Sequence, residues 1–123
     1  MNYCEVYGRL GVETAIVKFE KKDGTIRLML ATRNMSTADI EHGNRRGLLA
    51  GHDKRCSINN GNIAVIDLML GEGRSFSIDR LIYIEFMGEI KTQEEYDRVY
   101  EIYSQRKREL EAEANKEISM DDL

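Results

Sequence analysis

Residues 71–86, GEGRSFSIDRLIYIEF, decide the fold that we expect for this chain. The stretch opens with a Gly-Glu-Gly turn and continues as an alternating segment in which Phe76 and Ile78 point inward. After a short polar break, a denser apolar run follows from residue 81 to residue 86. β-Branched and aromatic residues crowd a segment that is too short and too closely bounded by glycine for a helix. We therefore predict two β-strands here.

The composition indicates one soluble globular domain. The chain has 123 residues, enough to bury a hydrophobic core without disulfides or metal ions. Its content of 41% hydrophobic and 33% charged residues argues against disorder of the whole chain. No apolar run approaches the ~20 residues of a membrane span, and no signal-peptide pattern opens the chain. Cys4 and Cys56 lack a CxxC spacing, which indicates reduced thiols. We expect a cytoplasmic protein without membrane association.

The net charge of −4 is unevenly distributed along the chain. Residues 1–91 carry 13 Lys and Arg against 12 Asp and Glu, a balance of +1, whereas residues 92–123 carry 5 against 10, a balance of −5. A globally acidic chain is a poor candidate for nonspecific binding of duplex DNA, which depends on phosphate neutralisation. The nearly neutral body can still hold a local basic patch, because steering depends on the local field.

Residues 15–32 have the pattern of a β-hairpin. Apolar residues alternate on both sides of a Lys-Lys-Asp-Gly turn at residues 21–24. Asp-Gly between alternating apolar segments is a strong hairpin signal, because Gly24 can adopt the positive φ that the loop demands. We interpret Lys21 and Lys22 at the tip as solubility residues.

A second hairpin is predicted from residues 54–58 and 62–70 around an Asn-Asn-Gly turn. Its second arm is nearly continuous in apolar residues, which favours a strand covered on both faces. Asp67 in this arm either lies on the solvent face or pairs with a nearby arginine such as Arg74 or Arg80. A structural salt bridge is favoured over catalysis, because no partner acid or base is visible.

Two other segments show weaker patterns. Residues 1–14 have little periodicity and are predicted as an irregular lead-in or a short edge strand. Residues 35–53 are predicted as a loop insertion, in which Ser36 or Thr37 caps a single turn and three glycines prevent a long helix. A solvated excursion and a phosphate-reading loop both remain open for this insertion. Its basic candidates, with those just beyond it, are Arg45, Arg46, Lys54 and Arg55.

Residues 92–117 are predicted as an α-helix. Thr92 and Glu95 form a capping box, acidic residues fill the first turn, and basic residues follow at 106–108, as the helix dipole favours. An apolar stripe at three- and four-residue steps should pack the first half on the predicted strands. Beyond residue 104 the stripe thins, so the second half projects, pairs with a second copy or frays. Residues 118–123 are predicted to be disordered.

Two motifs occupy the predicted strands. The first, F-x-K-K-D-G-T-x-R-x-M-x-x-T, is matched by Phe19, Lys21, Lys22, Asp23, Gly24, Thr25, Arg27, Met29 and Thr32. The second, D…R-x-F-x-x-D-R-I, is matched by Asp67, Arg74, Phe76, Asp79 and Arg80, with Leu81 where isoleucine is usual. With these motifs, residues 15–86 resemble a WYL_2-like family of phage-encoded, Sm-like or SH3-like β-barrels related to the WYL domain. The Trp-Tyr-Leu triplet of the parent domain is absent, and the C-terminal helix lies outside the resemblance.

The resemblance implies a mainly β fold, a small SH3/Sm-like antiparallel barrel of about five bent strands at residues 1–91 followed by the C-terminal α-helix. It also implies a phage origin, a location in the cytoplasm of the infected bacterial host, and a non-enzymatic module that binds nucleic acid or a nucleotide-like ligand. Guanidinium groups suit such ligands, because they bind phosphate in a bidentate way and stack on bases. The candidate binding residues are Arg74 and Arg80 at matching positions, with Arg27 on a neighbouring strand, joined by Arg45, Arg46, Lys54 and Arg55.

An enzyme is the weakest hypothesis. His42 and His52 lack a metal-ligand spacing such as HExxH, and Cys56 has no partner nearby in the sequence. We expect no catalytic residue, no metal and no cofactor.

The competing class is a phage protein that binds and modulates a host protein, as an inhibitor or adaptor in host takeover, through its barrel and acidic helix. Tyrosines are common at interfaces, so the candidate partner-binding residues are Tyr96, Tyr100 and Tyr103. Packing of these tyrosines on the protein's own barrel is the simpler interpretation. A homodimer through the C-terminal helix is a further expectation.

Overall fold

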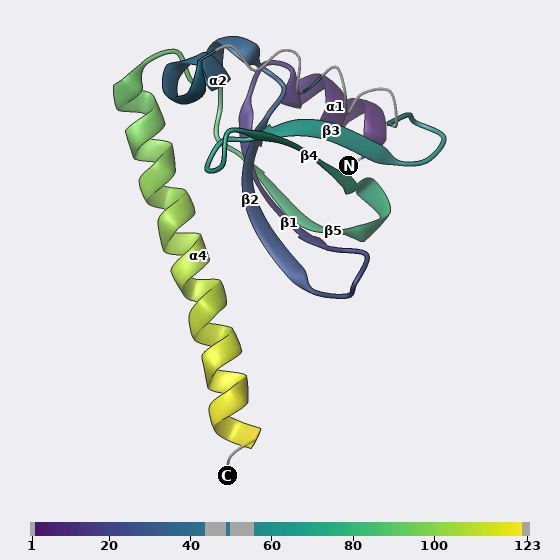
Figure 1. Cartoon of the computed structure of the whole chain (residues 1–123), viewed down its shortest axis with the longest axis vertical. Helices are drawn as coiled ribbons and strands as arrows, with labels where there is room; N and C mark the ends of the chain where they lie inside the picture. The colour runs from purple at the N-terminus through teal and green to yellow at the C-terminus, as the bar shows by residue number, and fades with distance from the viewer. Residues whose placement is uncertain (1, 44–48, 50–55, 122–123) are drawn as a thin grey trace.

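The molecule is built on a strongly bent antiparallel sheet (Figure 1). Short helices lie at one end of the sheet, and a long helix runs along its side. This computed structural model describes residues 2–43, 49 and 56–121, with side chains as far as residue 114. In chain order the elements are α1 (Tyr3–Leu10), β1 (Thr14–Glu20), β2 (Ile26–Thr32), α2 (Met35–His42), β3 (Asn62–Asp67), β4 (Glu72–Ser77), the 3-10 turn η1 (Ile78–Arg80), β5 (Leu81–Phe86) and α4 (Gln93–Asp121).

The first hairpin forms as its sequence predicts. β1 and β2 pair antiparallel in one register from Thr14–Thr32 to Glu20–Ile26. Gly24 has a φ of 87°, and the Asp23 carboxylate accepts hydrogen bonds from the backbone N–H and the hydroxyl of Thr25. These two bonds lower the pKa of the Asp23 carboxyl and close the turn.

The second predicted hairpin is wrong, because β3 does not pair with the segment that precedes it. The strand order is β4-β3-β2-β1-β5, so β3 pairs with β4 and β2. Residues 56–58 do not form a strand, and residues 54 and 55 lie outside the described residues. The side-chain Oδ1 of Asn60 accepts hydrogen bonds from the backbone amides of Ser57 and Asn62. The Asn-Asn-Gly turn is therefore a local loop that leads into β3.

β4 and β5 confirm the two strands predicted from residues 71–86, and η1 forms the break between them. Phe76 is 2% exposed and points into the core, as expected. β4 and β5 are the outer strands of the sheet but follow each other in the chain through η1, so the sheet curls on itself into a small barrel.

The three central strands are buried on both faces. The inner cluster fills the barrel with residues such as Val17, Met29 and Ile63. The outer cluster includes Ile16, Leu30 and Ile66, and it is covered by α2 and α4. This arrangement explains the continuous apolar run of β3, because each fully buried aliphatic side chain contributes about 1.5–3 kcal/mol.

α1 corrects the expectation that residues 1–14 form an irregular lead-in or a short edge strand, because Tyr3–Leu10 are helical. The Asn2 side chain caps the helix by accepting a hydrogen bond from the Glu5 amide at 2.9 Å. Val6 and Leu10, one turn apart, are fully buried against the inner cluster. The sequence does carry the signal, an Asn cap followed by apolar residues one turn apart, but the helix is only eight residues long and contains Gly8.

α2 is longer than the predicted single turn and starts earlier. Its cap is Asn34, whose side chain accepts a hydrogen bond from the Ser36 amide at 3.1 Å, so neither Ser36 nor Thr37 is the cap. Thr37 is instead fully buried, and its hydroxyl donates to the Ile90 carbonyl at 2.8 Å. α2 thereby joins the segment before α4 to the outer face of the sheet.

α4 begins with the predicted capping box, in which the Glu95 amide donates to the Thr92 hydroxyl at 3.2 Å. Its first half packs on the outer cluster through Tyr96, Val99 and Tyr103. The helix continues to Asp121, past the predicted end at residue 117, and its second half extends beyond the sheet (Figure 1). No helix among the described residues has both the length and the apolar character to cross a membrane.

The turn between β3 and β4 depends on Gly71. Its φ is 68°, and a Cβ at this position would lie 2.6 Å from Nδ1 of His42. Gly71→Ala is expected to lower the free energy of unfolding by about 2 kcal/mol, because a positive φ and a steric clash add. Gly24→Ala is the matched control: its φ is 87° but no atom lies within 4 Å of the added Cβ, so we expect about 1 kcal/mol. Urea denaturation of both variants measures the difference, and equal losses would contradict the clash.

Candidate functional site

A cleft of about 670 Å³ opens at the mouth of the barrel, where the β1–β2 turn faces β4 and η1. We call it the cationic cleft. Its lining residues come from five segments of the chain and are Phe19, Glu20, Lys21, Lys22, Asp23, Arg27, Asn62, Arg74, Ser75, Phe76, Ser77 and Arg80.

The floor of the cationic cleft is aromatic. Phe19 and Phe76 occupy inward positions on β1 and β4, and their ring centroids lie 5.8 Å apart. They are only 6% and 2% exposed, because they also close this end of the inner cluster. The cleft therefore ends on the hydrophobic core.

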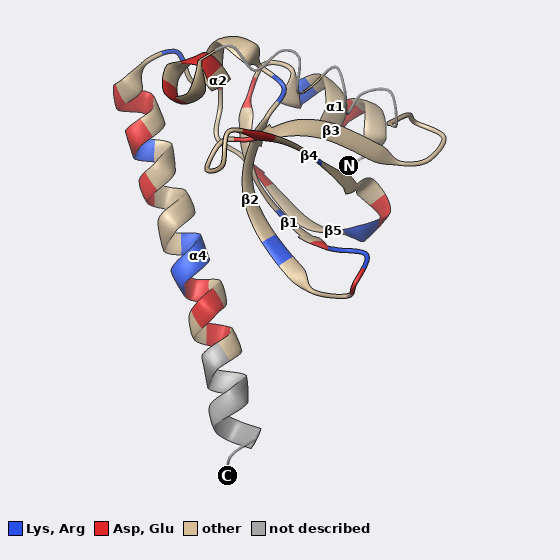
Figure 2. Cartoon of the chain, in the orientation of Figure 1, with Lys and Arg blue, Asp and Glu red and all other residues tan. Residues whose placement is uncertain are grey.

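The rim of the cleft is positively charged. Five lining residues are Lys or Arg and two are Asp or Glu, a balance of +3. In Figure 2 the ribbon carries the blue of Lys and Arg at the β1–β2 turn and at the connection from β4 to β5. The sequence predicted Arg27, Arg74 and Arg80 as one site, and the structure brings all three together. It also places Lys21 and Lys22 in the wall, although their position at a hairpin tip suggested a solubility role.

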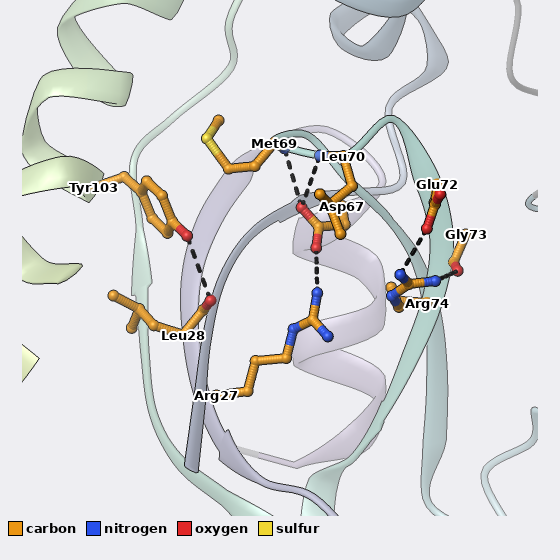
Figure 3. A network of polar contacts seen from close by, with 9 residues as sticks. All are labelled: Arg27, Leu28, Asp67, Met69, Leu70, Glu72, Gly73, Arg74 and Tyr103. Carbon is orange, nitrogen blue, oxygen red and sulfur yellow. Dashed lines mark hydrogen bonds and ion pairs between the residues drawn. The ribbon is translucent and has the colours of Figure 1, made fainter. Parts of the chain in front are cut away.

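Arg27 is committed to a structural ion pair. Its Nη2 lies 2.8 Å from Oδ2 of Asp67, whose side chain is 4% exposed (Figure 3). The other carboxylate oxygen of Asp67 accepts hydrogen bonds from the amides of Met69 at 3.0 Å and Leu70 at 3.4 Å. Asp67 thus has the predicted structural role, but its partner is Arg27 and not Arg74 or Arg80.

Arg74 is held more loosely. Its Nη2 lies 2.6 Å from Oε2 of Glu72, and its Nη1 donates to the Gly73 carbonyl at 3.2 Å (Figure 3). The Glu72 side chain is 56% exposed, and exposed ion pairs contribute at most about 1 kcal/mol. An anionic ligand could therefore replace Glu72 as the partner of Arg74 at little cost.

Arg80 has the least compensated charge of the three arginines. Its Nη1 donates to the Lys21 carbonyl at 3.0 Å, which orients the guanidinium across the cleft mouth. In the part of the chain that the structure describes, no carboxylate lies within 4.0 Å of Arg80. Its remaining N–H groups face solvent and can bind an anion.

The other candidate residues fall into two groups. Arg45, Arg46, Lys54 and Arg55 lie outside the described residues. Tyr96 and Tyr103 are buried in the protein's own core, and their hydroxyls donate to the carbonyls of Leu68 and Leu28. Only Tyr100 is exposed, at 46%.

Chemically, the cationic cleft is equipped to bind anions. Guanidinium, ammonium, hydroxyl and amide groups donate hydrogen bonds around an apolar floor. Among the described residues, its lining contains neither histidine nor cysteine. No group of three or more His, Cys, Asp and Glu side chains suited to a metal ion occurs among the described residues.

Comparisons with known proteins place the chain in a family. Residues 5–82 match the family described as WYL_2, Sm-like SH3 beta-barrel fold. An uncharacterized 11.5 kDa protein in the Gp31-cd intergenic region of Enterobacteria phage T4 is 39% identical over 79 residues, which cover 64% of this chain and 72% of the relative. This relative supports a phage origin, and no solved structure gives a significant match. The chain belongs to the WYL_2 family of Sm-like SH3 β-barrels, as its two motifs predicted.

Proposed function

We propose that the cationic cleft binds nucleic acid or a nucleotide-like ligand, with Arg80 as the main phosphate contact. The observation that carries this proposal is the convergence of three arginines and two lysines on one cleft with an aromatic floor. Phosphate is the anion that such a set suits best, since guanidinium groups bind it in a bidentate way. The apolar floor suits the base of the same ligand.

The arginines are not equivalent in this proposal. Arg80 contributes most, because its charge has no carboxylate partner among the described residues. Arg74 contributes next, after exchange of Glu72 for a phosphate oxygen. Arg27 contributes least directly, because Asp67 already neutralises it. This order distinguishes the cleft from a surface that attracts nucleic acid only through its total charge.

Arg80→Glu is expected to weaken binding of a fluorescent single-stranded oligonucleotide by about tenfold or more, because a charge-assisted hydrogen bond is lost and repulsion is added. The melting temperature should stay within a few degrees, since Arg80 donates only one hydrogen bond to the main chain. Fluorescence polarisation measures the affinity, with mononucleotides as competitors to compare the two ligand types.

Arg98→Glu on α4 is the matched control, with the same charge change outside the cleft. We expect it to keep most of the wild-type affinity. Equal losses in the two variants would show binding through overall charge alone, and unchanged binding by Arg80→Glu would remove this residue from the site.

The second candidate function is binding of a host protein through the barrel and α4. It is supported by the exposed ring of Tyr100 and by the acidic residues of α4 that surround it, such as Asp97 and Glu101. A pull-down from host lysate with the wild type and Tyr100→Ala, with and without nuclease, tests this alternative. A protein retained after nuclease treatment by the wild type but lost with Tyr100→Ala would support it.

A further inference from the structure

A groove runs along α4 where the helix leaves the sheet. It consists of two hollows of about 390 and 490 Å³ that share Met69, Tyr103, Lys107 and Glu111. We call it the α4 groove. It lies between the helix, the start of β2 and the β3–β4 turn, and it shares Lys21 and Arg27 with the cationic cleft but not the aromatic floor.

Three large apolar side chains are exposed along the α4 groove. Ile26 is 42% exposed, Leu70 is 53% exposed and Tyr100 is 46% exposed. These three are among eight large apolar side chains that are exposed in the described part of the chain, and they gather along this one groove. Clustered apolar side chains of this kind mark interaction surfaces.

As far as its side chains are described, the second half of α4 has little of its surface packed against the rest of the protein. α4 has 29 residues and is about 44 Å long. Among its described side chains, which end at residue 114, the last buried one is Tyr103, the eleventh residue of the helix, and Leu110 about two turns later is half-buried. Helices in water depend mainly on tertiary packing of one face. A partner along the α4 groove would supply that packing.

The charges of the groove identify the partner. Arg106 is already paired with Glu85 on β5, and Arg108 lies 3.9 Å from Glu101. Lys107 and Glu111 line both hollows, and neither forms an ion pair within the described residues. On α4 the groove thus presents one basic and one acidic side chain without an ion partner among the described residues, one helical turn apart, beside Lys21 and the Arg27–Asp67 pair on the barrel side.

We propose that the α4 groove is a homodimer interface in which the α4 helices of two copies pack antiparallel. A two-fold axis near residue 109 places Lys107 of each copy opposite Glu111 of the other, because a two-fold interface presents the same patch twice. A parallel arrangement would instead place lysine opposite lysine and glutamate opposite glutamate. The surface is therefore complementary to itself in one orientation only.

The test is a charge swap, with the dimer dissociation constant measured by analytical ultracentrifugation of the full chain. Lys107→Glu and Glu111→Lys each place two like-charged pairs across the interface, so each should weaken the dimer by about tenfold or more. The double variant, K107E with E111K, recreates the pairs with reversed signs and should recover an affinity close to that of the wild type. An equimolar mixture of the two single variants should form heterodimers.

Glu113→Lys is the matched control. Residue 113 lies about 200° around the helix from residue 111, because each residue turns the helix by about 100°. The Glu113→Lys substitution makes the same charge change as Glu111→Lys and should leave the dissociation constant of the dimer unchanged. A monomeric wild type at every concentration would overturn the proposal. So would a dimer whose affinity the single reversals do not change, or one that the double variant fails to restore.

Discussion

Replacing Asp67 with alanine is expected to lower the free energy of unfolding by about 3–4 kcal/mol. Asp67 is 3% exposed, and its carboxylate accepts three hydrogen bonds, one from Arg27 and two from the amides of the β3–β4 turn (Figure 3). Its removal leaves two amides and one guanidinium without their acceptor. Arg27 is 27% exposed and can turn to water, so the cost stays at the lower end for a broken buried pair.

Glu72→Ala is the control for this prediction. It also removes a carboxylate that pairs with an arginine of the cationic cleft, but the Glu72 side chain is 56% exposed. We expect a loss of at most about 0.5 kcal/mol. Chemical denaturation of both variants at neutral pH measures the two values. A loss for Asp67→Ala as small as that for Glu72→Ala would show that the buried pair does not hold the turn.

Stability is expected to fall steeply at high pH because of Tyr96. Burial raises the pKa of the Tyr96 hydroxyl from 10.0 to about 12. The folded state therefore holds the proton more tightly than the unfolded chain does. The stabilisation is fully present below pH 10 and is lost as the pH rises through about 12, and it amounts to about 2.7 kcal/mol. Burial also raises the pKa of Tyr103, which adds to the loss in the same pH range.

Tyr96→Phe isolates this contribution, because phenylalanine fills the same space and cannot ionise. At neutral pH the variant loses only the hydrogen bond to the Leu68 carbonyl, about 1 kcal/mol. We expect its unfolding free energy to decline less between pH 10 and 12 than that of the wild type. Chemical denaturation at several pH values measures the two unfolding free energies. An equal decline in the two proteins would contradict a buried neutral hydroxyl at this position.

The strands could be predicted where turn chemistry and alternation agree. The β1–β2 hairpin follows from Asp23-Gly24, and both the strands and the break of residues 71–86 follow from their own pattern. The partner of β3 could not be predicted, because its apolar run is buried on both faces and shows no preferred side. The Asn-Asn-Gly segment does form a turn, but this turn lies in a loop and not in a hairpin. The turn that pairs β3 with β4 contains Gly71.

The site was predicted in part for a related reason. The match to the second motif located Arg74 and Arg80, and the structure explains the first of them, because alternation along β4 puts Arg74 on the same face as Phe76. Which carboxylate neutralises which arginine depends on pairings between strands distant in the sequence. Thus Arg27 and Asp67, forty residues apart, form the buried pair that the sequence assigned to other arginines.

The central claim is that the cationic cleft is the ligand-binding surface and that Arg80 contacts the phosphate. A titration of the ¹⁵N-labelled protein with a short single-stranded oligonucleotide, followed by NMR chemical shifts, tests this claim most directly. We predict that the largest shifts fall on the amides of residues 19–23 and 74–80, and that Arg80→Glu removes them. Shifts confined to α4, or an unchanged spectrum at saturating oligonucleotide, would contradict the claim.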